Sequence, residues 1–191
     1  MSNQDLIDEI RRWNTLFVAS STVDSSLYEL AFFKIFIKFE KFLSDSFENY
    51  AIGNLSIHGY CPSRRLNFDD LEHLNKVLKK NDRAFVNHFE VIKTISDCFF
   101  SDNPFDIIKT DPNYSNIIKD MKIIRDYIAH ESNSAKNKYV AGILNNRPFI
   151  EPHQHLLNTK RGASISYYTY YINAIQEISN FIINTPITPS V

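Results

Sequence analysis

The longest helical pattern in the sequence covers residues 27–51, which read LYELAFFKIFIKFEKFLSDSFENYA. Apolar side chains recur there at helical spacing, and additional phenylalanines widen the apolar face beyond a single stripe. A helix with so broad an apolar face has to be covered on several sides. The charged residues between positions 34 and 41 exclude a membrane span and leave a face for water. We therefore predict a long buried helix that runs the length of a small bundle.

Five further segments show helical periodicity bounded by capping or breaking residues. The predicted helices are residues 3–19, 69–80, 83–100, about 112–130 and 163–183. The counts of 15 Phe and 10 Tyr against only 4 Gly favour long packed elements over turn-rich β structure. Residues 133–160 mix polar and apolar positions with Gly142 and Pro148, so a short irregular insertion is expected there. Within it, residues 139–144 could form a strand or a short helix.

The whole chain, residues 1–191, is predicted to form one all-α domain of long antiparallel helices. Its formal net charge of -1 argues against a surface coated in nucleic acid but allows a local basic face. The N-terminus lacks a basic region followed by an apolar run, and no stretch of about 18 apolar residues occurs. We therefore expect no membrane segment and a cytoplasmic location.

The segment that carries the functional argument is MKIIRDYIAHES, residues 121–132, at the end of the helix predicted to begin near Pro112. Arg125 lies next to the apolar stripe of this helix. Asp126 and His130 are four residues apart on a neighbouring face, so the carboxylate can orient the imidazole or hold its charged form. Arginine offers a planar fork suited to phosphate, and histidine side chains titrate near neutral pH. These are the two groups that cleavage of a phosphodiester bond without a metal would require. The alternative is a surface arginine and a histidine that bonds the last helix carbonyls.

The stretch RDYIAHES resembles the signature of the HEPN superfamily. Members carry an arginine, a polar residue that is often asparagine, and a histidine after a short spacer. Arg125, Asp126 and His130 occupy these three positions, with Asp126 in place of the commoner asparagine. The resemblance implies an all-α bundle that dimerises so that both copies of the motif face one cleft. Many members are metal-independent ribonucleases, and others bind nucleotides or act as inactive scaffolds.

The resemblance therefore implies an endoribonuclease that works as a homodimer on RNA without a metal or other cofactor. His130 would be the acid/base group, Arg125 the phosphate clamp, and Asp126 the residue that orients His130. Ribonuclease toxins and phage-defence effectors are the nearest comparison, so an antitoxin or a neighbouring defence protein is an expected partner. The alternatives are a non-catalytic module that binds nucleotide or RNA through Arg125, and a purely helical regulatory partner.

Basic residues are in excess around the motif. Between positions 115 and 165 there are eight Lys or Arg residues and four Asp or Glu residues. Such an excess is often only a solvated face, but around an Arg/His pair it is also what a phosphate-lined groove would contain. Lys122, Lys136 and Lys138 are the residues expected to bind the substrate.

The pair His153 and His155 has the alternation by which two histidines on a strand could share a metal. No third or fourth ligand with suitable spacing is evident in the sequence. We therefore expect a loop at this position and no metal site.

Overall fold

The computed structural model describes residues 1–19, 23–78 and 88–184, and every regular element in these ranges is a helix. The all-α prediction is therefore confirmed for the described part of the chain. None of the helices in these ranges is long and apolar enough to cross a membrane. The bounds are α1 Gln4–Ala19, α2 Leu27–Ala51, α3 Leu71–Leu78, α4 His88–Phe99, α5 Asp106–Lys109, α6 Pro112–His130, α7 Asn133–Gly142, α8 Pro152–Leu157 and α9 Tyr167–Ile183.

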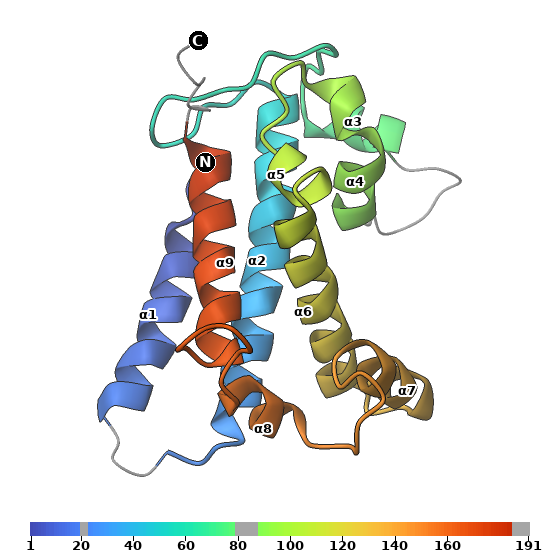
Figure 1. Cartoon of the computed structure of the whole chain (residues 1–191). Helices are drawn as coiled ribbons and strands as arrows, with labels where there is room; N and C mark the ends of the chain where they lie inside the picture. Colours follow the sequence, from blue (N-terminus) through green and yellow to red (C-terminus); the bar gives the residue numbers. More distant parts are fainter. Residues whose placement is uncertain (20–22, 79–87, 185–191) are drawn as a thin grey trace.

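The long helix α2 lies at the centre of the molecule and packs against α1, α6 and α9 (Figure 1). It runs antiparallel to α1 and α6 and parallel to α9. The short helices gather at the two ends of this bundle. In the view of Figure 1, α3, α4 and α5 lie at the upper end, and α7 and α8 lie at the lower end. The lower end is therefore where α6 finishes and where the RDYIAHES motif lies.

The core around α2 is rich in aromatic side chains. The Phe47 ring packs with the rings of Phe99, Phe100 and Phe105, with centroid separations of 5.0, 5.7 and 5.9 Å. The Tyr50 hydroxyl donates a hydrogen bond of 2.7 Å to the carbonyl oxygen of Ile182 and so ties α2 to the end of α9. These contacts cover the broad apolar face of α2 on several sides, as its sequence predicts.

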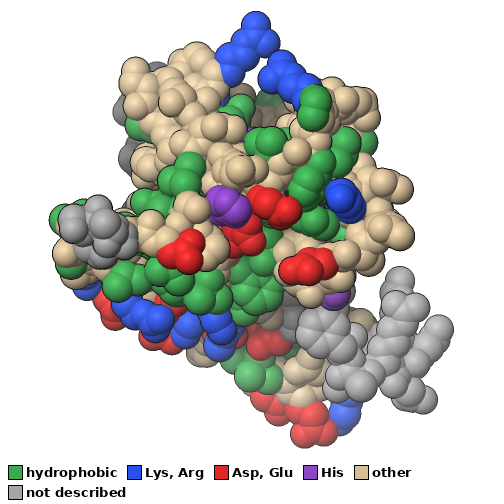
Figure 2. All heavy atoms as spheres, turned by 90° about the horizontal axis from the view of Figure 1, so that it is seen from below, with side chains coloured by type: hydrophobic (Ala, Val, Ile, Leu, Met, Phe, Trp, Pro, Cys, Tyr) green, Lys and Arg blue, Asp and Glu red, His purple; other side chains and the backbone are tan. Residues whose placement is uncertain are grey.

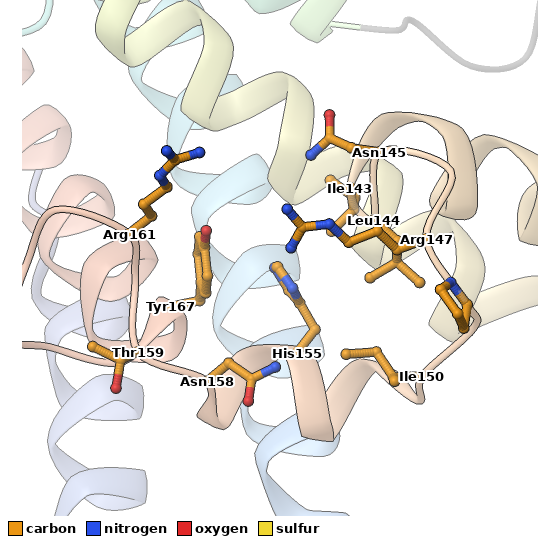
Figure 3. A pocket seen from close by; sticks show the side chains of 11 residues that line it. Ile143, Leu144, Asn145, Arg147, Ile150, His155, Asn158, Thr159, Arg161 and Tyr167 are labelled. Carbon is orange, nitrogen blue, oxygen red and sulfur yellow. The ribbon is translucent and has the colours of Figure 1, made fainter.

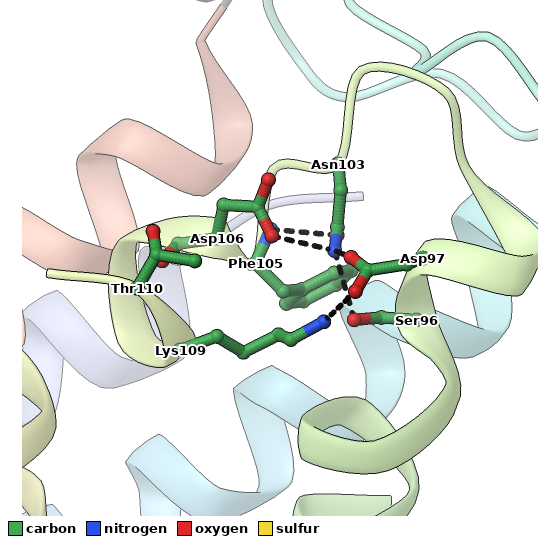
Figure 4. Close-up of polar contacts among 7 residues, drawn as sticks. All are labelled: Ser96, Asp97, Asn103, Phe105, Asp106, Lys109 and Thr110. Carbon is green, nitrogen blue, oxygen red and sulfur yellow. Dashed lines mark hydrogen bonds and ion pairs between the residues drawn. The ribbon is translucent and has the colours of Figure 1, made fainter.

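A polar cluster joins the end of α4 to α5 (Figure 4). The Asn103 amide donates to Ser96 Oγ, Asp97 Oδ1 and Asp106 Oδ1 at 2.9, 2.7 and 2.9 Å, and Lys109 forms an ion pair with Asp97. Hydrogen bonds from Lys109 and Asn103 lower the pKa of the Asp97 carboxyl, whereas burial raises the pKa of Asp106. The cluster holds α5 in place immediately before α6 begins.

Three of the predicted helices have bounds in the structure that differ from the prediction. The third and fourth helices, predicted over 69–80 and 83–100, are shorter in the described ranges, and residues 79–87 lie outside those ranges. The last helix begins at Tyr167 and not at position 163. Its start is set by Ser166, whose Oγ accepts a hydrogen bond of 3.1 Å from the backbone N–H of Thr169.

The prediction of an irregular insertion over 133–160 was wrong in part, because α7 and α8 lie within it. Ser132 caps α7 by accepting a hydrogen bond of 3.2 Å from the backbone N–H of Ala135. Pro152 occupies the first turn of α8, and the Gln154 side chain accepts a hydrogen bond of 3.0 Å from the backbone N–H of Glu151. Both helices are too short for a clear periodic pattern in the sequence, and their formation depends on capping residues and tertiary packing.

Candidate functional site

Helix α6 carries the motif to the lower end of the bundle. Asp111 caps its first turn by accepting a hydrogen bond of 2.8 Å from the backbone N–H of Asn113. The helix ends where Glu131 adopts a left-handed conformation with φ 45°. His130 is therefore the last helical residue, and its side chain is exposed.

Helix α7 packs directly against the last turns of α6. The rings of Tyr127 and Tyr139 stack with centroids 5.2 Å apart and an interplanar angle of 14°. Gly142 permits a close approach, since a Cβ atom there would lie 2.9 Å from Ile123 Cδ1. These contacts pack the second half of α7 against α6 and so hold α7 beside the motif.

A pocket of about 200 Å³ lies between α6 and α7, and we call it the motif pocket. Its lining residues are Ile123, Asp126, His130, Ser132, Ser134, Ala135 and Lys138. The structure thus brings together Asp126, His130 and Lys138, three of the residues predicted to form the site. Ser132 and Ser134 add hydroxyl groups that the sequence argument did not include.

Arg125 is held by two carboxylates and does not line the motif pocket. Its Nη2 atom lies 2.5 Å from Glu40 Oε1, and its Nη1 atom lies 2.7 Å from Asp126 Oδ1. The guanidinium carbon also lies 5.6 Å from the centroid of the Phe36 ring. The side chain is only 19% exposed, and Nε is buried without a hydrogen-bond partner among the described residues. Most of the charge of Arg125 is therefore neutralised inside the protein.

The Asp126 carboxylate contacts Arg125, and among the described residues no hydrogen bond joins it to His130. The imidazole of His130 likewise makes no hydrogen bond or ion pair with any described side chain. Both side chains nevertheless face the same pocket, so a change in the ion pair at Arg125 would leave Asp126 available to His130.

Two of the three predicted substrate-binding lysines lie outside the motif pocket. Lys138 on α7 lines it, whereas Lys122 and Lys136 do not. The Nζ atom of Lys136 lies 4.1 Å from the centroid of the Phe149 ring, in a cation–π contact. One lysine is thus available to a phosphate bound beside His130.

The remaining basic residues do not form one continuous patch. Figure 2 shows the lower end of the molecule, where Lys and Arg side chains lie in separate groups around Asp, Glu and His side chains. Arg147 and Arg161 line a second pocket of about 550 Å³ that shares no lining residue with the motif pocket. Of the eight basic residues between positions 115 and 165, only Lys138, Arg147 and Arg161 line these two pockets, and the other five line neither.

His153 and His155 lie on α8 and not on a strand or loop, and they have different neighbours. The Nδ1 atom of His153 lies 2.9 Å from Glu29 Oε1, whereas the His155 ring packs on Tyr167. In the described ranges, no group of three or more His, Cys, Asp or Glu side chains could hold a metal ion.

Glu40, the residue that restrains Arg125, was not predicted from the sequence. The two residues are 85 positions apart in the chain and meet only because α2 packs against α6. No local spacing could have identified this pair. Because of this pair, any phosphate that binds Arg125 must compete with two carboxylates for the guanidinium.

We expect Arg125→Ala to lower the free energy of unfolding by about 1–3 kcal/mol, because it leaves the carboxylate of Glu40 partly buried without a cation. Glu40→Gln in the same background should recover part of this loss, since a neutral amide needs no counter-charge. Urea unfolding of the wild type, both single variants and the double variant measures the coupling. Additive effects of the two substitutions would contradict this role of the ion pair.

Comparisons with known proteins place the chain in no family: no family model, no curated protein and no solved structure matches it.

Proposed function

We propose that the chain is a metal-independent endoribonuclease of the HEPN type that cuts RNA at a composite site in a homodimer. The observation that supports this most is the convergence of Asp126, His130 and Lys138 on one pocket at the end of α6. The pocket combines an exposed imidazole, a carboxylate and an ammonium group, and it lies next to Arg125. These are the groups that proton transfer and phosphate binding in an RNA transesterification require.

In the proposed reaction, a base removes the proton from the ribose 2′-hydroxyl and the 2′-oxygen attacks the adjacent phosphorus. The bond from phosphorus to the 5′-oxygen breaks, and an acid gives that oxygen a proton. The products are a 2′,3′-cyclic phosphate and a free 5′-hydroxyl. His130 is the proton-transfer group, and Lys138 holds a phosphate oxygen.

Arg125 takes part through an exchange of partners. Glu40 keeps the guanidinium oriented at 2.5 Å, and the substrate phosphate replaces Asp126 as the second anion. Asp126, released from Arg125, then orients the imidazole of His130 four residues further along α6. The exchange replaces one anion by another, so the half-buried guanidinium keeps two anionic partners throughout.

A second chain in a homodimer supplies the second histidine that the reaction needs. The motif pocket contains a single histidine, whereas transesterification needs a base and an acid. In a dimer with twofold symmetry, two copies of His130 and Arg125 face one another across a shared cleft. The proposed biological role is that of a toxin or defence effector, held in check by an antitoxin or a neighbouring defence protein.

The proposal is tested by incubating the purified protein with RNA in excess EDTA, alongside Arg125→Lys and Asp126→Asn. Cleavage by the wild type and reduced cleavage by both variants would support it. Lysine keeps the charge at position 125 but cannot engage Glu40 and a phosphate with one planar fork. Equal cleavage by all three proteins would exclude the assigned roles of Arg125 and Asp126.

The cleavage rate is expected to follow a bell-shaped pH profile, because one histidine has to be neutral and the other protonated. The two apparent midpoints belong to the coupled pair and not to either side chain alone. Initial rates in buffers of constant ionic strength, from about pH 5 to 9, measure the profile. A flat profile over this range would remove His130 as the titrating group.

Mixing two inactive variants is expected to restore part of the activity. Heterodimers of Arg125→Ala and His130→Ala chains would combine an intact arginine and an intact histidine from different subunits in one cleft. The mixture is assayed after co-refolding, with each variant alone as its control. Absence of any recovery, with heterodimers present, would contradict a site that draws these groups from two chains.

One observation favours a non-catalytic alternative. Arg125 is neutralised by Glu40 and Asp126, which suits a structural role in a binding module or helical regulatory partner. A binding module would bind RNA or a nucleotide without cutting RNA, whereas a helical regulatory partner would neither bind nor cut it. An RNA gel shift without cleavage, lost on Arg125→Lys, would favour the binding module.

A further inference from the structure

A second pocket lies apart from the motif pocket, and we call it the arginine pocket after Arg147 and Arg161 (Figure 3). It lies among the loop after α7, helix α8, the loop after α8 and the first residue of α9. Its volume of about 550 Å³ is in the range that small ligands occupy. In the view of Figure 3, the two arginine side chains lie on either side of the Tyr167 ring.

The two arginines supply uncompensated positive charge. Both side chains are exposed, and neither forms an ion pair with a described residue. No Asp or Glu is among the lining residues. This contrasts with Arg125, which two carboxylates neutralise. Two guanidinium forks without counter-ions around one cavity are suited to a phosphate group.

The backbone that carries Arg147 is well fixed. Its N–H donates to the carbonyl oxygen of Leu144 at 3.1 Å, and the N–H of Asn146 donates to that of Val140 at 3.0 Å. Asn145 and Asn146 both adopt left-handed conformations, with φ 52° and 60°, and asparagine tolerates this region better than most residues. The turn presents Asn145 and Arg147 to the same cavity.

The backbone that carries Arg161 is closed into a short loop. The N–H of Lys160 donates to the carbonyl oxygen of Ile165 at 2.9 Å, and the N–H of Tyr167 donates to that of Asn158 at 3.0 Å. Gly162, at φ 79°, makes the reversal possible. Both arginines therefore start from ordered backbone, which reduces the entropy that a ligand must overcome.

Two stacked rings form an aromatic wall of the pocket. The His155 and Tyr167 rings stack with centroids 4.4 Å apart and an interplanar angle of 28°. His155 is only 6% exposed, and its Nε2 atom is buried without a hydrogen-bond partner among the described residues. Burial also lowers its pKa, so the ring stays neutral near pH 7 and the charge of the pocket comes from the arginines. Ile143 and Leu144 add apolar surface beside this wall.

We propose that the arginine pocket binds a phosphorylated small molecule that carries a flat ring, with a nucleoside monophosphate as the simplest example. Arg147 and Arg161 hold the phosphate, and the ring packs against Tyr167 and the neighbouring apolar side chains. The amides of Asn145 and Asn158 are placed to bond polar edges of that ring. The site is separate from the motif pocket, so the proposal does not depend on the ribonuclease activity.

The test is calorimetric titration of the purified full chain, without added metal, with each of the four ribonucleoside 5′-monophosphates. Inorganic phosphate and adenosine serve as probes that carry only one half of the proposed ligand. The variants are Arg147→Gln, Arg161→Gln and Tyr167→Leu. Arg65→Gln is the matched control, because Arg65 is exposed and lies in the loop between α2 and α3, at the opposite end of the bundle.

We expect at least one monophosphate to bind more tightly than inorganic phosphate or adenosine. Each arginine variant should weaken that binding by about ten- to a hundredfold, and Arg65→Gln should leave it unchanged. Tyr167→Leu should weaken the nucleotide but not inorganic phosphate. The proposal is overturned if no monophosphate binds, or if both arginine variants bind like the wild type. It is also overturned if phosphate or adenosine alone binds as tightly as the nucleotide.

Discussion

Replacing His130 with alanine is expected to lower the rate of RNA cleavage by about 10²- to 10⁴-fold, the usual contribution of a positioned acid/base group. The imidazole is exposed at the last position of α6 and has no partner among the described side chains, so its removal leaves no buried group unsatisfied. The fold should therefore remain intact. The rate is measured under single-turnover conditions in EDTA, together with the far-ultraviolet circular dichroism of the variant.

His58→Ala is the matched control for this substitution. His58 is also exposed, but it lies in the loop after α2, at the end of the bundle opposite the motif pocket. Its replacement should change the cleavage rate by less than about twofold, within the range expected of a surface change far from the chemistry. Equal losses in both variants, or an active His130→Ala protein, would contradict the assignment.

Buried His155 is expected to lower the free energy of unfolding of the protein in acid. Burial lowers the pKa of this histidine from 6.5 to about 4. The unfolded chain therefore takes up the proton first as the pH falls, and that uptake favours unfolding. The contribution is fully present above about pH 6.5 and is lost progressively between about pH 6.5 and 4. Its expected size is about 3 kcal/mol.

His155→Phe isolates this effect from the titration of carboxylates. The phenyl ring keeps the contacts with Tyr167 and Tyr139 but has no ionisable nitrogen and no buried Nε2 atom that needs a partner. Urea unfolding at a series of pH values is measured for both proteins. As the pH falls from 6.5 to 4, the free energy of unfolding of the wild type should decrease relative to that of the variant. A constant gap would show that His155 titrates normally.

The elements that the sequence predicts well are those that periodicity alone determines. The bounds of α2 and α6 agree with the prediction, because long apolar stripes and the Asp111–Pro112 start specify them. The helices α7 and α8 are short, and their stability comes from caps and from packing on α6, α2 and α9. Contacts of this kind join residues distant in the chain, so a single sequence does not reveal them.

The candidate site was predictable only in its local part. Asp126 and His130 are four residues apart on one helix, and the structure indeed lines one pocket with both. The partner of Arg125 on α2 could not be predicted, because it depends on how two helices pack. The same holds for Arg147 and Arg161, which line one pocket only because of the conformations of two loops. Asn145 and Gly162, both with positive φ, make these loop conformations possible.

The central claim is that His130 and its neighbours cut RNA without a metal, and the chemistry of the cleaved ends tests it most directly. A short RNA oligonucleotide is incubated with wild-type protein and with His130→Ala in excess EDTA, and the products are analysed by mass spectrometry. We expect the wild type to leave 2′,3′-cyclic phosphate and 5′-hydroxyl ends, and we expect His130→Ala to leave neither. Intact RNA with the wild type, 3′-hydroxyl and 5′-phosphate ends, or the same products from His130→Ala would contradict it.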